Sequence, residues 1–492
     1  MAAKPPDEGL TSLGLHGAVY AVGNVLSRLG GFILLPLYLR MLTPEEYGVL
    51  EMFYVTSAIL GVFVSGGFSQ GALRFYFDFE READRKAVIT TALAAAGGLS
   101  GLAAVLLWPF ADPAGRLLAG TSGYASSFQL VLLTLVVQMT SEVGLSYFRA
   151  RNYSGKFVAA SVGKLVLQVV INVITVAKLG WGVPGVLLGN LLGAAASGVV
   201  VVGITMAECG RAYRHTVLVA MLRYTYPMVL AGVAGVVLER ADRFILQHAS
   251  GLDAVGVYAL GDKLAMILAI GFLQPFRTAY GAYRFSVIKS VNREVLQRRV
   301  LRYYLVVACF FGLALTVPAP TLLRMLSNEA YWGAAVVLPV LVFKIVLGGA
   351  EYVFQSGILF AKKTRYSMII TIVTGLMRVG ITLALVRRLG LMAPAYAGVA
   401  AALVAAIAMA RVSRRFDPVD WDLPALGKIT AIVGVCLAVG LPAGGGPVGS
   451  LAVVLAFPVL CVATRVITPG EIAAAWAAVA ERFRGMRRAG AG

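Results

Sequence analysis

Long apolar segments recur along the whole chain, and each approaches the roughly 20 residues that a helix needs to cross a bilayer. The first set lies at residues 13–39, 47–72, 87–111, 126–148, 157–177 and 184–206. The second set lies at residues 224–247, 255–281, 302–323, 333–360, 366–386 and 391–410, and two more segments follow at 425–442 and 447–466. Inside a membrane every backbone polar group has to be satisfied within the protein, which favours helices for segments of this length. The pattern predicts an all-α integral membrane protein with about fourteen transmembrane helices.

The composition excludes a soluble protein. Of the 492 residues, 59% are hydrophobic and only 14% are charged, whereas soluble domains are about 25% charged. The formal net charge of +19 suits cytoplasmic loops beside anionic lipid better than nucleic acid. We therefore expect membrane lipids, and not nucleic acid, as partners.

Lysine and arginine are several times more frequent in the loops after even-numbered segments than in those after odd-numbered ones. Positive loops stay in the cytoplasm, so we expect both termini to be cytoplasmic. The tail after Thr468-Pro469-Gly470 reads as a basic amphipathic helix, which we expect to lie on the inner membrane surface.

Soluble catalytic and metal-binding patterns are missing from the sequence. The four cysteines are scattered, and the three histidines lack ligand spacing. There is no phosphate-binding loop and no dinucleotide fingerprint. We expect a transporter, not an enzyme, with no metal and no cofactor beyond coupling to H⁺ or Na⁺.

The chain resembles itself at an offset of about 210 residues, as in transporters built from parallel repeats. Lys178-Leu179-Gly180 matches Arg388-Leu389-Gly390, and Tyr47-Gly48-Val49 matches Val255-Gly256-Val257. We predict four parts. They are an N-terminal lobe at 1–210, a C-terminal lobe at 211–415, two additional transmembrane helices at 416–468 and a cytoplasmic tail at 469–492.

Charged residues inside the apolar segments are functional candidates, because burying them in a membrane is costly. The cations outnumber the acids, and a positive interior suits an anion, with arginine suited to phosphate. The substrate-binding candidates are Arg28, Lys164, Arg240, Arg243, Lys263, Lys344 and Arg378. The candidates for ion coupling are Glu142, Asp242, Asp262 and Glu351.

Some of these charges have a simpler reading. Glu239 and Arg243 are four residues apart on one helix and could neutralise each other. Arg277 and Glu51 lie near helix ends, where we expect their side chains to reach the interface.

Several short motifs resemble the polysaccharide and O-antigen flippases of the multidrug/oligosaccharidyl-lipid/polysaccharide exporter superfamily. They are Leu42-Thr43-Pro44-Glu45-Glu46-Tyr47-Gly48, Arg74-Phe75-Tyr76, Asp242-Arg243-Phe244 and Gly256-Val257-Tyr258. The resemblance covers nearly the whole chain. It implies two six-helix lobes forming a V around a central cationic cavity. It also implies a bacterial inner-membrane protein that moves a polyprenyl-diphosphate-linked oligosaccharide to the outer leaflet, with a polysaccharide polymerase and chain-length machinery as partners.

Two other transporters remain as alternatives. Ser27-Arg28 with Gly31-Phe32 resembles the lipid II flippases, but Leu34 and Leu35 stand where that family has an Arg-Asp pair. A cation-coupled multidrug exporter would need an acidic cavity, and the intramembrane charges here are mainly basic. A membrane glycosyltransferase or polymerase usually has a large extramembrane loop, and the longest loops here are short.

Overall fold

The computed structural model describes residues 31–288, 290, 292–441 and 446–471. Over this part of the chain the structure contains helices and no strands. Ten helical stretches are long and apolar enough to cross a membrane, and two shorter apolar helices accompany them. Two of the ten stretches, at 215–286 and 365–414, are each long enough for two crossings. The all-α membrane fold is therefore confirmed, and these stretches agree with the expected number of crossings.

The chain divides into two compact units. The first holds residues up to Ala259 together with Leu326–Tyr331, and the second holds Leu260–Met325 and the chain from Trp332 onward. The division falls inside one long helix, whereas the repeat boundary was predicted at 210/211. A compact unit need not coincide with a sequence repeat, so the predicted four-part organisation stays a prediction.

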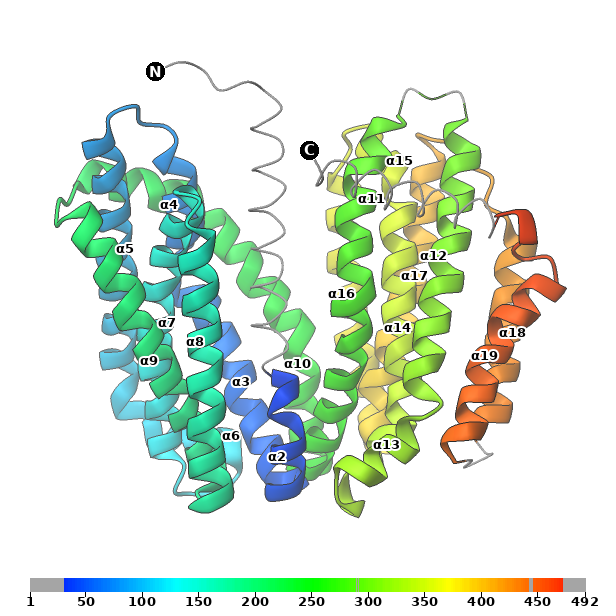
Figure 1. Cartoon of the computed structure of the whole chain (residues 1–492), viewed down its shortest axis with the longest axis horizontal. Coiled ribbons are helices and arrows are strands. Elements are labelled where there is room, and N and C mark those ends of the chain that lie inside the picture. Colours follow the sequence, from blue (N-terminus) through cyan, green and yellow to red (C-terminus); the bar gives the residue numbers. More distant parts are fainter. Residues whose placement is uncertain (1–30, 289, 291, 442–445, 472–492) are drawn as a thin grey trace, which may run out of the picture. The chain divides into compact units, whose positions relative to one another are not determined.

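The first unit is built from the helices drawn in blue to green in Figure 1. In chain order they are α2 (Leu35–Met41), α3 (Pro44–Val64), α4 (Phe68–Tyr76), α5 (Glu82–Leu107), η1 (Trp108–Phe110), α6 (Ala111–Ala119), α7 (Ala125–Ala150), α8 (Ser154–Asn172), η2 (Val173–Lys178), α9 (Gly182–Cys209), the first part of α10 (His215–Leu268) and η4 (Glu329–Tyr331).

The start of α3 shows how the local sequence sets a helix boundary. Thr43 caps the helix, because its Oγ1 accepts a hydrogen bond of 3.2 Å from the backbone N–H of Glu46. The Glu46 carboxylate accepts one of 2.8 Å from the N–H of Thr43 in return. Pro44 fills the first helical position, where a missing N–H costs nothing. The Thr-Pro-Glu-Glu motif therefore encodes a capping box.

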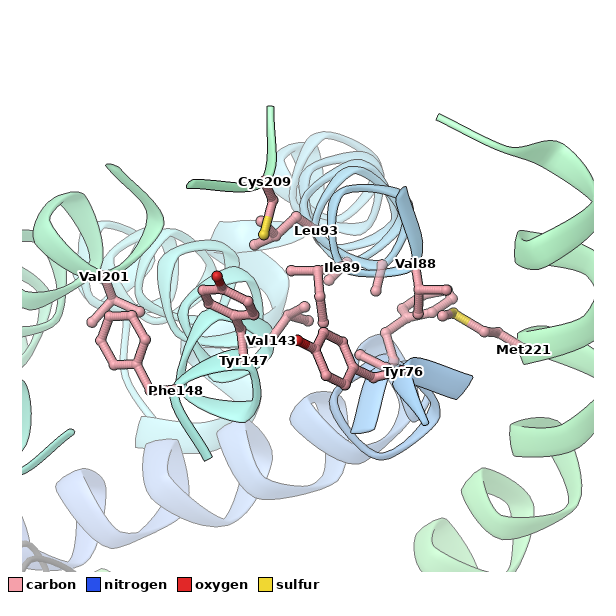
Figure 2. Packing of buried hydrophobic residues seen from close by; sticks show 14 of the residues in the cluster. Tyr76, Val88, Ile89, Leu93, Val143, Tyr147, Phe148, Val201, Cys209 and Met221 are labelled. Atoms are coloured by element: carbon pink, nitrogen blue, oxygen red, sulfur yellow. The ribbon is translucent and has the colours of Figure 1, made fainter. Parts of the chain in front are cut away.

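The core of the first unit joins α4, α5, α7, α9 and the start of α10. Figure 2 shows Tyr76, Ile89, Val143 and Tyr147 meeting in this cluster, and each is at most 2% exposed. Met221 packs against it from α10. This packing holds the helices that carry the first unit's charged residues.

A glycine divides α10. Gly251 has a φ of 84°, a left-handed conformation that a side chain would disfavour. It therefore separates the two crossings that the sequence predicted at 224–247 and 255–281.

The second unit contains the rest of α10 and the remaining helices. They are η3 (Ala269–Leu273), α11 (Gln274–Ser286), α12 (Arg293–Thr316), α13 (Ala319–Leu326, whose last residue belongs to the first unit), α14 (Ala334–Phe354), α15 (Ser356–Phe360), α16 (Arg365–Leu389), η5 (Gly390–Met392), α17 (Ala393–Arg414), α18 (Leu423–Gly440) and α19 (Pro447–Ala463).

The two helices that follow α17 attach to α12. Phe457 of α19 is fully buried beside Ile429 of α18 and Leu313 of α12. On outer faces, by contrast, apolar side chains such as Val105 of α5 and Val199 of α9 are 70% and 74% exposed. Apolar faces of this kind suit contact with lipid chains.

Candidate functional site

Two cations and one acid meet within the second unit. The ammonium of Lys344 on α14 lies 4.0 Å from the carboxylate of Asp262 on α10. Gly398 of α17 makes room for the cations: a Cβ at this position would stand 2.9 Å from Cδ of Lys344 and 3.9 Å from Nε of Arg378 on α16. Lys263 follows Asp262 directly and is also half-buried. We call Asp262, Lys344 and Arg378 around Gly398 the cationic cluster.

The cationic cluster has the electrostatics of an anion site. Lys344 lies against the carboxylate of Asp262, and Arg378 shares the space beside Gly398 with Lys344. All three side chains are half-buried, where charges interact more strongly than in water. Arginine can also offer two parallel N–H donors to a phosphate. Three helices that are far apart in sequence thus bring together predicted residues that the sequence could not pair.

A second group of cations in this unit was not predicted as a site. Arg277 and Arg284 of α11 both lie over the ring of Tyr352, with the guanidinium carbons 5.4 and 4.6 Å from its centroid. Arg277 donates to the carbonyl of Gly348 at 3.1 Å, and Arg284 donates to the hydroxyl of Tyr352 at 3.2 Å. Glu351 lies within electrostatic range of Arg277. The seven-residue spacing of the arginines, which places them on one helix face, was the available sequence signal.

A buried polar network occupies the first unit. Arg243 donates to Asp242 at 2.8 Å, and the hydroxyl of Tyr258 donates to the same carboxylate at 3.1 Å. Glu51 of α3 lies 3.5 Å from Arg243 and 3.6 Å from Arg240. Asp242 and Arg243 are only 3% and 2% exposed. We call these five residues the α3–α10 network.

One alternative left open for this region does not hold, and one expectation about it was wrong. Arg243 pairs with Asp242 and Glu51, while Glu239 is exposed and makes no ion pair within the described part of the chain. Glu51 does not reach the interface, because it lies against the two arginines with 16% of its side chain exposed. Sequence spacing along one helix could not anticipate a partner on α3.

An open polar pocket lies elsewhere in the first unit, between α3, α4 and α7. It has a volume of about 510 Å³ and is lined by Glu142 and by several uncharged polar side chains. Lys164 on α8 lies within electrostatic range of Glu142. In the region that the structure describes, Lys164 forms no hydrogen bond or ion pair.

The predicted site residues therefore fall into separate groups. The cationic cluster, the α3–α10 network and the neighbourhood of Glu142 account for most of them, and Glu351 lies beside Arg277. Arg28 lies outside the described residues. Within the described residues, no three His, Cys, Asp or Glu side chains are placed to hold a metal ion.

Membrane-crossing helices that enclose charged side chains define a polytopic membrane protein, and known structures share this fold. The chain is similar to an inward closed structure of the lipid II flippase MurJ, with a TM-score of 0.71 over 92% of this chain and 100% of that one, at 12% identity. It is also similar to an inward-facing multidrug resistance transporter of the MATE family, with a TM-score of 0.62 over 79% and 94% of the two chains, at 18% identity.

The sequence match identifies the family. The family described as polysaccharide biosynthesis protein matches residues 15–282, which is more than half of the chain. The chain belongs to this family. One relative, Lsg locus putative protein 1 of Haemophilus influenzae, is 25% identical over 288 residues, which cover 57% of this chain and 67% of the relative. The resemblance drawn from the sequence is thereby confirmed.

Proposed function

We propose that the protein is a flippase that moves a polyprenyl-diphosphate-linked oligosaccharide from the cytoplasmic to the outer leaflet of the bacterial inner membrane. Transport would proceed by alternating access and would serve the synthesis of a surface polysaccharide. Membership of the polysaccharide biosynthesis family supports this class of function. The observation that carries the proposal is the cationic cluster, in which Lys344 pairs with Asp262 and Arg378 lies beside Lys344 at Gly398.

The cluster suits a diphosphate for a chemical reason. A diphosphate offers several anionic oxygens, so Arg378 can bind two of them while Lys344 contributes a point charge. Without substrate, Asp262 holds Lys344 and offsets part of its charge. When the diphosphate enters, Lys344 can exchange one anionic partner for another without becoming unpaired. Lys263, Lys164 and Arg28 are further candidates for contact with the substrate.

A gradient of H⁺ or Na⁺ is the proposed source of energy. Carboxylates in membrane segments are the natural carriers of such coupling. Asp242 is the least suited of the four candidates, because Arg243 and Tyr258 already occupy its oxygens. Glu142 and Glu351 are half-buried and are better placed to exchange an ion, whereas Asp262 is half-buried and already pairs with Lys344.

The test uses proteoliposomes with a fluorescent polyprenyl-diphosphate oligosaccharide whose appearance in the opposite leaflet is measured. We expect Arg378→Gln and Lys344→Met each to slow translocation by about tenfold or more, because each removes a charge-assisted contact. Arg116→Gln is the matched control, since Arg116 is exposed and, among the described residues, forms an ion pair with Asp112 of its own helix alone. Normal translocation by both cluster variants would contradict the proposal.

Two other substrates belong in the same assay. Lipid II is the first, because a lipid II flippase shares the fold. Small organic cations are the second, because a multidrug transporter also shares it. The net positive charge of the cationic cluster favours the diphosphate over organic cations. Faster movement of lipid II than of the oligosaccharide carrier would reassign the substrate.

A further inference from the structure

The pocket between α3, α4 and α7 differs in chemistry from the cationic cluster. The described residues that line it include no lysine or arginine, and their polar members are Tyr54, Ser57, Ser65, Ser69, Gln70, Gln138 and Glu142. Its volume of about 510 Å³ lies within the usual range for ligand pockets. Among the described residues, the lining therefore offers no cation to neutralise a diphosphate. It suits a ligand that is rich in hydroxyl groups.

The hydrogen-bonding capacity of the lining is only partly used. Tyr54 accepts a hydrogen bond from Asn190 at 3.1 Å, and Ser69 pairs with Ser146 at 2.7 Å. The side chains of Ser57, Gln138 and Glu142 make no hydrogen bond or ion pair to any described residue, although each is partly buried. These three side chains therefore present donors and acceptors to whatever occupies the pocket.

The unused groups match the hydroxyls of a sugar. Each sugar hydroxyl both donates and accepts, so it needs partners of both kinds. Glu142 supplies acceptors, Gln138 supplies one acceptor and two donors, and Ser57 supplies either. A carboxylate that accepts from neutral hydroxyls makes the stronger, charge-assisted kind of hydrogen bond.

We propose that this pocket binds a sugar residue of the transported lipid-linked glycan. The inference rests on the proposed function and assigns a second recognition element to the same substrate. The cationic cluster would recognise the diphosphate that all such carriers share, and the pocket would recognise the glycan. Selectivity between glycans would then depend on the first unit.

The test compares carriers that differ only in the sugar. The probes are a synthetic polyprenyl diphosphate without sugar and the same carrier bearing one glucose, galactose or N-acetylglucosamine. Binding to the full-length protein in nanodiscs is measured by native mass spectrometry. We expect at least one glycosylated carrier to bind about tenfold more tightly than the bare carrier.

Substitutions in the pocket test whether it is the source of the tighter binding of glycosylated carriers. Glu142→Gln and Gln138→Ala should each remove most of this difference in affinity and leave binding of the bare carrier unchanged. Thr140→Ala is the matched control on α7, because Thr140 bonds to a backbone carbonyl of its own helix and does not line the pocket. Unfolding temperatures are compared so that loss of fold is recognised, and Ser57→Ala provides a smaller change at the same pocket.

The outcomes separate this inference from the proposed function. Lys344→Met should weaken all carriers by the same factor, and if it does not, the diphosphate assignment fails. Equal binding of the bare and all glycosylated carriers, or an advantage that survives the Glu142, Gln138 and Ser57 variants, overturns the sugar pocket. If Glu142→Gln abolishes the response of transport to a pH gradient and leaves the sugar advantage intact, the pocket is an ion-coupling site and the inference is also overturned.

Discussion

Gly48 of α3 and Gly256 of α10 face each other where their helices cross in the first unit. A Cβ on Gly48 would stand 2.1 Å from the carbonyl oxygen of Leu252, and one on Gly256 would stand 2.0 Å from the carbonyl oxygen of Pro44. The contact is reciprocal, because each glycine lies against the backbone carbonyl that is one helical turn before the other glycine. The two positions also correspond in the predicted sequence repeat, so the repeat places a small residue on both sides of one crossing.

Because the two helices cross so closely, one methyl group added at either glycine should lower the stability of the protein strongly. Gly48→Ala and Gly256→Ala should each lower stability by about 3 kcal/mol, because the new atom meets backbone that cannot rotate away. Thermal unfolding in detergent measures the effect. Gly203→Ala is the control, because nothing lies within 4 Å of its added Cβ. Equal unfolding temperatures for the Gly48, Gly256 and Gly203 variants would refute the close crossing.

The α3–α10 network predicts that Arg243 serves stability first. Arg243→Met would leave Asp242 and Glu51 buried beside an apolar side chain, and breaking a buried ion pair in this way costs about 3–5 kcal/mol. Tyr258→Phe removes one hydrogen bond to Asp242 and should cost only about 1 kcal/mol. Unfolding temperature and folded yield are the measurements. A stable Arg243→Met protein that fails only in transport would instead assign Arg243 to the substrate.

The contacts of Glu471, at the end of the described chain, predict that local stability depends on pH. Burial raises the pKa of Glu471, but hydrogen bonds from Thr468 and Tyr303 and the charge of Arg302 lower it more, so the net pKa lies below its ordinary value. The contribution to stability is therefore present at neutral pH and is lost as the pH falls through that lowered pKa. Amide exchange at Thr468, whose N–H donates to Glu471 at 2.9 Å, should become several-fold faster in acid after correction for intrinsic rates. Glu471→Ala should show the faster exchange already at neutral pH, and unchanged protection would refute the contact.

Much of the fold could be predicted from the sequence, because the bilayer imposes a length and a polarity that can be counted. The apolar segments, the capping box at Thr43 and the two helices added after α17 all follow from such local rules. The charged sites could not be predicted in the same way. Asp262 and Lys344 are 82 positions apart in the sequence, and only helix packing decides that they meet.

The missed features share a physical cause. One partner of Arg243 is on α3, and Lys344 has its space because residue 398 on α17 is a glycine. A glycine in the sequence does not show which neighbouring side chains occupy the space beside it. The same holds for the pocket at Glu142, which depends on where three helices leave a gap.

The cationic cluster can be tested without changing any charge. In Gly398→Val, the new Cβ would stand 2.9 Å from Cδ of Lys344, so that side chain must move, and the added methyl groups take up space next to Arg378. Because a displacement of about 1 Å in a binding group can reduce a rate by up to about a hundredfold, we expect translocation to fall by at least tenfold. Gly380→Val on α16 is the matched control, because nothing lies within 4 Å of an added Cβ there. Both variants keep the same net charge, so a selective loss in Gly398→Val would show that the positions of the cations, and not their number, determine transport. Equal rates for the two variants would separate the cluster from the transport path.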